Sequence, residues 1–140
     1  MKIKSNEVEV NASQETVFKL FKDTSNLHFL LPEDEVSDWK SNEDNCSFKV
    51  QKGTITISLV QNGYEGFDKI FMKSGEKSPF PFSLTINILP SQEKVKGYIE
   101  FDGEVNMFLK MMVEKPLTNL FNNMASQLKS HFETTKRNFF

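Results

Sequence analysis

The residues able to perform acid–base or nucleophilic chemistry are few in this sequence. There are two histidines, His28 and His131, and one cysteine, Cys46. Each histidine adjoins a phenylalanine, and neither belongs to a motif that pairs it with a nucleophile and an orienting carboxylate. Cys46 alternates with Phe48 and Val50, which is typical of a buried, unreactive thiol. We therefore predict surface or boundary histidines, an inert cysteine and no catalytic residue.

Carboxylates are plentiful, but their spacing fits no metal site. The acidic run 33–35 follows Pro32, and Glu43 and Asp44 lie in a second polar stretch. A calcium loop needs oxygen ligands at defined intervals and a glycine at its sharp turn, and this pattern is missing. One cysteine supplies neither a disulfide nor a metal-ligand cluster, and the glycines form no phosphate-binding loop. The sequence predicts solvated loop charge, no metal and no cofactor.

Composition narrows the class of protein. The chain has 140 residues, which suits one domain spanning residues 1–140, and 14 phenylalanines are available to fill its core. Its 17 basic and 19 acidic residues are interspersed, so nothing predicts nucleic-acid binding. No apolar stretch approaches the roughly 20 residues of a membrane span, and residues 1–7 are too polar for a signal peptide. We expect a cytoplasmic protein with no integral membrane segment.

The first third of the chain predicts one strand and two short helices. Residues 3–10 alternate as a strand, and Ser13 is a good N-cap for the helix that follows. A second short helix is expected over residues 27–31, because Pro32 disfavours its continuation.

Six more strands are expected between residues 36 and 101. Most of them place apolar side chains on one face only, which favours an antiparallel sheet with a wetted outer side. Asn62-Gly63 is the strongest hairpin signal, and Pro90 is expected to end the fifth of these strands. The predicted strands cover residues 36–40, 46–51, 54–60, 65–73, 82–88 and 95–101.

The last third predicts a long amphipathic helix rich in methionine. Four of the six methionines lie between residues 107 and 124, and the apolar spacing from 105 to 132 is helical. Such a stripe has to be buried against the sheet. Because proline removes a helical hydrogen bond, Pro116 predicts a kink or break near Glu114-Lys115.

This order of elements resembles the helix-grip fold of the START-like superfamily, also called SRPBCC, which includes the birch-pollen-allergen type. Segment 10–18, VNASQETVF, is similar to the opening of that family, and Leu30-Leu31-Pro32 is similar to the step after its second short helix. The proline often seen near residue 13 or 14 is absent. The resemblance implies an α+β fold in which a curved sheet of about seven strands grips the C-terminal helix. Members bind lipids, sterols or polyketides, and others are cyclases or co-chaperone domains.

We accordingly predict that a small apolar molecule, lipid-like or fatty-acid-like, binds in a cavity between the sheet and the long helix. Residues 107–112 and the loop around Phe80 are hypothesised to form a movable flap over its mouth. The expected lining consists of large apolar side chains from both layers: Trp39, Phe48, Phe71, Phe80, Phe82, Phe101, Phe108, Met111, Met112, Phe121 and Met124.

Two alternatives stay open. A co-chaperone-like interaction module would have a filled core and an apolar patch outside, with a protein partner that the sequence does not identify. A polyketide cyclase or dehydratase-like enzyme would need a polar pair inside the cavity, and the strand alternation places none there.

The terminal Phe139-Phe140 either folds back on the sheet or frays.

Overall fold

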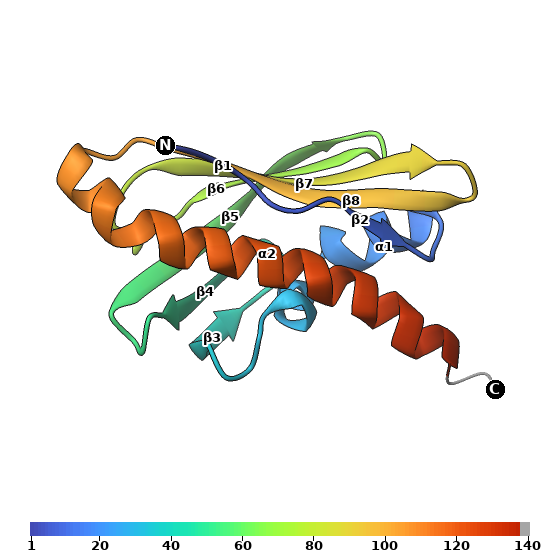
Figure 1. The fold of residues 1–140 in the computed structure, drawn as a ribbon, viewed down its shortest axis with the longest axis horizontal. Coiled ribbons are helices and arrows are strands. Elements are labelled where there is room, and N and C mark those ends of the chain that lie inside the picture. Colours follow the sequence, from blue (N-terminus) through green and yellow to red (C-terminus); the bar gives the residue numbers. More distant parts are fainter. Residues whose placement is uncertain (138–140) are drawn as a thin grey trace.

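One antiparallel sheet curves around a long helix in the computed structural model, which describes the backbone of residues 1–137 and the side chains of residues 1–133 (Figure 1). The strands lie in the order β1-β8-β7-β6-β5-β4-β3, and β2 also pairs with β8. They are β1 (Lys2–Lys4), β2 (Val8–Val10), β3 (Ser37–Ser41), β4 (Asn45–Val50), β5 (Ile55–Glu65), β6 (Lys69–Ser74), β7 (Phe82–Ser91) and β8 (Lys94–Gly103). The helices are α1 (Gln14–Lys22), the 3-10 helix η1 (Thr24–Leu30) and α2 (Met107–Arg137). The predicted α+β helix-grip architecture is confirmed. The Phe139-Phe140 tail lies outside the described residues.

The sheet has eight strands because the first predicted strand is split in two. β1 and β2 both pair with β8, and Ser5 lies between them. The buried Ser5 hydroxyl accepts a hydrogen bond from the Ile99 amide at 2.8 Å, and the Ser5 amide donates to the Ile99 carbonyl at 2.8 Å. The interruption therefore leaves these backbone groups of β8 paired.

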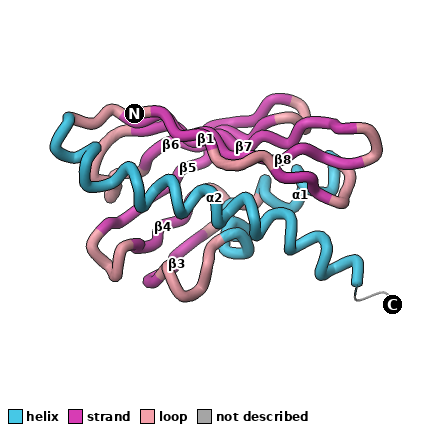
Figure 2. Tube along the Cα trace, in the orientation of Figure 1, coloured by secondary structure: helices cyan, strands magenta, loops and turns pink. Residues whose placement is uncertain are grey.

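The two short helices begin at side-chain caps. The Ser13 hydroxyl accepts a hydrogen bond from the Thr16 amide at 3.2 Å, as predicted for the start of α1. The Asp23 carboxylate accepts one from the Ser25 amide at 3.0 Å, so η1 begins at Thr24, earlier than expected. Figure 2 shows α2 across the hollow of the sheet, with the short helices beside its C-terminal half.

β5 and β6 form the predicted hairpin, but its turn covers residues 66–68, so the turn predicted at Asn62-Gly63 is wrong. β5 runs through both residues to Glu65, and its pairing with β6 shifts register between Gln61 and Tyr64. Gly63 has φ +95° at this irregularity. Glycine adopts a positive φ as readily in a β-bulge as in a turn, so Gly63 supports a bulge here instead of the predicted turn. The strand predicted to end at Pro90 likewise continues to Ser91.

The core lies between α2 and the concave face of the sheet. Gly97 of β8 permits close approach, because a Cβ atom there would lie 2.6 Å from Leu128 Cδ2. The helix buries one row of side chains against the sheet: Val113, Leu117, Leu120, Phe121, Met124 and Leu128.

α2 is continuous through Pro116, so the predicted break is wrong. Figure 1 shows its first turns running at an angle to the remainder of the helix, which agrees with the alternative of a kink. Pro116 accounts for a bend in this part of the helix, because its ring meets the preceding backbone and one helical hydrogen bond is lost.

Candidate functional site

A pocket of about 540 Å³ opens where α2 passes the end of β4. Three segments far apart in sequence form it: the loop after η1, the β4–β5 turn and the bent part of α2. The lining residues are Asp34, Glu35, Val36, Ser37, Val50, Gln51, Lys52, Lys115, Pro116, Asn119 and Leu120.

The helical wall of this pocket is shaped by Pro116. Pro116 has no N–H, so the Met112 carbonyl four residues earlier has no helical donor. The Thr118 hydroxyl donates to the Glu114 carbonyl at 2.7 Å in the same stretch. Leu120, one turn later, is buried and supplies apolar surface to the pocket.

The β4–β5 turn forms the opposite wall in a costly conformation. Gln51 and Lys52 have φ of 52° and 54°, and Gly53 follows at 86°. The Gly53 amide donates to the Val50 carbonyl at 3.2 Å, which closes the turn. Non-glycine residues in this region cost on the order of 1 kcal/mol each, and the Thr54 hydroxyl adds a second local hydrogen bond by donating to the Gln51 carbonyl at 2.7 Å.

The third wall is tied directly to the helix. The Glu35 amide donates to the Pro32 carbonyl at 3.1 Å, which turns the chain after η1. The Asn123 side-chain amide donates to Glu35 Oε2 at 3.0 Å. This hydrogen bond connects the acidic loop to α2.

The pocket has an apolar floor and a charged rim. Val50 and Leu120 are buried, and Val36 is half-buried. Asp34, Lys52 and Lys115 are exposed at the mouth. Glu35 also lies on the rim, so its two acidic and two basic side chains carry no net charge. Such a site can surround an apolar body and leave a polar end at the solvent.

Solved structures resemble this chain along nearly its whole length. XoxI from Bacillus cereus has a TM-score of 0.74 at 14% identity over 96% of this chain and 97% of that chain. TTHA0849 from Thermus thermophilus has 0.72 at 16% identity, over 96% and 99%. A START superfamily protein from Mycobacterium smegmatis has 0.66 at 15% identity, over 96% and 98%. The fold is the START-like helix-grip fold. No family model and no curated protein matches the sequence.

Within this START-like fold, four of the predicted lining residues form a packed aromatic cluster. The rings of Phe82 and Phe101 lie 4.9 Å apart, and Phe101 and Phe121 lie 5.2 Å apart. Phe80 packs edge-on against the first pair at 5.8 and 6.2 Å. Met124 is also buried. These side chains occupy the space between helix and sheet, outside the 540 Å³ pocket.

The other six predicted residues are dispersed. Trp39 stacks on the buried Phe48 at 6.0 Å near the β3 edge. Phe71 lies between the buried Ile70 and Met72, so it points to the outer face of the sheet. The remaining three, Phe108, Met111 and Met112, are 74%, 78% and 57% exposed.

The pocket residues themselves were missed because they come from two loops or turns, the strand ends beside them and α2, and these segments share no sequence pattern. The usable signals were Pro116 and the acidic run after Pro32, which sequence reasoning treated separately.

The two histidines lie at the surface or at its boundary, and Cys46 is buried, as the sequence predicted. His28 is exposed and stacks on Trp39 at 5.2 Å, and the half-buried His131 stacks on Phe29 at 5.1 Å. Burial raises the pKa of the Cys46 thiol to about 12. Within the described part of the chain, no group of three or more His, Cys, Asp or Glu side chains could hold a metal ion. The same residues include no helix long and apolar enough to cross a membrane.

Proposed function

We propose that this protein binds a small, mainly apolar molecule of lipid or fatty-acid type in the pocket between α2 and the β4–β5 turn. The observation that carries the proposal is the pocket itself. Its volume of about 540 Å³ falls within the roughly 300–1,000 Å³ of small-molecule sites. An apolar chain would lie against Val50 and Leu120, and its polar end would meet the lysines and carboxylates of the rim.

The packed aromatic cluster would be the deeper part of the site. A ligand longer than the pocket would reach Phe121 only if neighbouring rings moved. Phe80 is the ring best placed to move, because it belongs to the 75–81 loop rather than to a strand. The flap hypothesis therefore predicts slower hydrogen exchange at residues 76–82 and 105–115 when ligand is added. Unchanged exchange in both segments would refute the flap and leave the outer pocket as the whole site.

Native mass spectrometry of the purified protein, before and after organic extraction, tests the proposal first. A reproducible bound mass that extraction removes would identify the ligand class. Binding of a dansyl-labelled fatty acid to the extracted protein is the second measurement. Asn119→Trp fills the pocket mouth, and Ser126→Trp places the same side chain on an exposed part of α2 outside it.

We expect Asn119→Trp to weaken probe binding about tenfold or more, because the bulky side chain occupies space the ligand needs. Ser126→Trp should bind as the wild type does. Failure of the wild type to bind any fatty acid or apolar probe would overturn the proposal. Equal losses in both variants would show that the probe does not occupy this pocket.

A protein-interaction module is the second candidate function, and the closely packed aromatic cluster between α2 and the sheet favours it. A cytoplasmic location stays a prediction.

A further inference from the structure

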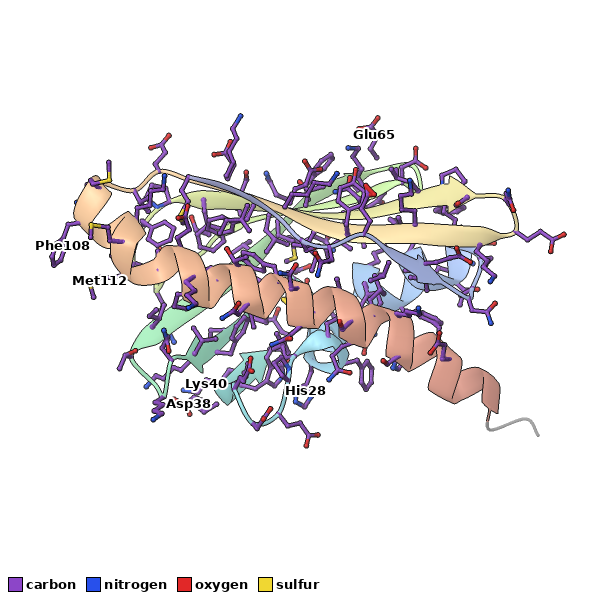
Figure 3. All side chains as sticks on the ribbon, viewed as in Figure 1. His28, Asp38, Lys40, Glu65, Phe108 and Met112 are labelled. Atoms are coloured by element: carbon purple, nitrogen blue, oxygen red, sulfur yellow. The ribbon has the colours of Figure 1, made fainter. Side chains whose placement is uncertain are left out.

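The first two turns of α2 carry a second apolar face that the fold does not use. Met107, Phe108, Met111 and Met112 are 72%, 74%, 78% and 57% exposed. Residues three and four apart are neighbours on a helix, so these four side chains form one continuous patch. We call this patch, residues 107, 108, 111 and 112, the apolar tip. Figure 3 shows Phe108 and Met112 projecting from one end of the molecule, away from the sheet.

The opposite face of the same turns is anchored in the protein. Val105, Leu109 and Val113 continue the buried row of α2 at steps of four residues and pack against the core. The Asn106 side chain accepts a hydrogen bond from the Leu109 amide at 2.8 Å, which caps the helix. The apolar tip is therefore a presented surface on an ordered helix. A helix that is apolar on both faces is normally covered on both.

The size of the apolar tip favours a particular cover. With roughly 150–200 Å² for each large side chain, the exposed fractions give an area on the order of 500 Å². This is as large as the main apolar patch of a typical monomer, about 300–600 Å². It falls short of the roughly 800 Å² per partner that a standard protein interface buries. An exposed area of this size on a projecting helix end is better covered by a deformable surface than by the rigid surface of a folded protein.

We infer that the apolar tip inserts into the surface of a lipid bilayer. Apolar side chains on one face of an interfacial helix enter the boundary between headgroups and acyl chains. Methionine is flexible and polarizable, so it suits such a disordered environment. Segment 104–115 contains two glutamates and two lysines and has no net charge. Insertion therefore depends on apolar burial rather than on attraction to anionic lipid. Lys115 and Pro116 connect the tip to the pocket rim, so the pocket mouth lies near the bilayer.

The test is flotation of the full chain with phosphatidylcholine vesicles, with and without phosphatidylglycerol. Phe108→Ser/Met111→Ser removes half of the tip. Tyr64→Ser/Phe67→Ser removes two other exposed rings, 49% and 41% exposed, from the β5–β6 hairpin. That hairpin lies away from the tip, as the position of Glu65 in Figure 3 shows.

The wild type should float with both vesicle types, and salt should change the bound fraction little. The tip variant should lose about tenfold or more of its partitioning, and the hairpin variant should keep it. Thermal unfolding checks that both variants fold. Asn119→Trp should still float, so failure of the pocket proposal leaves this result intact.

Four outcomes would overturn the inference: no flotation of the wild type, flotation of the tip variant, equal loss in both double variants, or binding that requires phosphatidylglycerol and disappears in salt. Self-association in sedimentation velocity that only the tip variant abolishes would assign the tip to a second copy of the chain instead.

Discussion

Replacement of Pro116 by alanine tests whether the bend in α2 creates the pocket. Proline lacks the amide that would bond to the Met112 carbonyl, and its ring displaces the preceding turn. Alanine restores the hydrogen bond and allows the helix to straighten. The helical wall, which includes Lys115 and Asn119, should then shift relative to the β4–β5 turn.

The stability change can be worked from the local structure. Proline in a helix interior costs about 3 kcal/mol relative to alanine. Met112 is exposed, so water can reach its carbonyl and recover part of that cost. Pro116 is half-buried, so its contacts in the pocket wall are also lost. We expect a net gain of about 1–3 kcal/mol in the free energy of unfolding, which raises the melting temperature by about 4–10 °C in a chain of this length.

Two measurements on Pro116→Ala test whether the bend creates the pocket and whether it costs stability. They are guanidinium unfolding and the affinity for a dansyl-labelled fatty acid. The variant should be more stable and should bind the probe about tenfold more weakly. Pro90→Ala is the matched control, because Pro90 is exposed at the end of β7 and lies outside the pocket. Its affinity should equal that of the wild type. A more stable Pro116→Ala with unchanged affinity would refute the link between bend and pocket, and a less stable one would refute the energetic argument.

Three further changes have defined outcomes. Burial raises the Cys46 pKa to about 12 from an ordinary 9.0, so the thiol's contribution to the free energy of unfolding is complete below pH 9.0 and is lost as the pH rises towards 12. Cys46→Ala has no thiol to ionise, so its free energy of unfolding relative to the wild type should rise by about 1.4 kcal/mol per pH unit in that window. Parallel pH profiles of the two proteins in urea unfolding would contradict this. Gly97→Ala places its Cβ against Leu128 and should cost about 1–3 kcal/mol, but less in a Leu128→Ala background, as a denaturant double-mutant cycle would reveal. Asn123→Ala removes the hydrogen bond to the acidic loop and should change stability by less than about 1 kcal/mol while hydrogen exchange in residues 32–37 accelerates; unaltered exchange there would show that the bond does not hold the pocket wall.

Much of the fold could be predicted from local pattern. The strands with clean alternation, such as 82–88 and 95–101, bury the predicted faces. Ser13 caps the first helix as its chemistry requires. In these places the local sequence favours one structure only. At Asn62-Gly63 two structures, a turn and a bulge, need the same backbone conformation, and pairing with β6 selected the bulge.

The pocket could not be predicted because its walls meet only in the folded chain. Residues 34–37, 50–52 and 115–120 show no shared periodicity, and two of the three segments belong to loops and turns. Periodic patterns identify faces of helices and strands. They do not show which loops come together, since that depends on the curvature of the sheet and on the bend of α2.

The methionine-rich part of α2 shows a second limit of pattern. The sequence interpretation joined Phe108, Met111 and Met112 to the row that begins at Leu117. At about 100° per residue, steps of four from Leu117 lead back to Val113 and Leu109, which are buried or half-buried. Met111 lies six residues before Leu117 and so falls on another face. The start of α2 therefore has two apolar faces, one used by the core and one left exposed, and only the second needs a partner outside this chain.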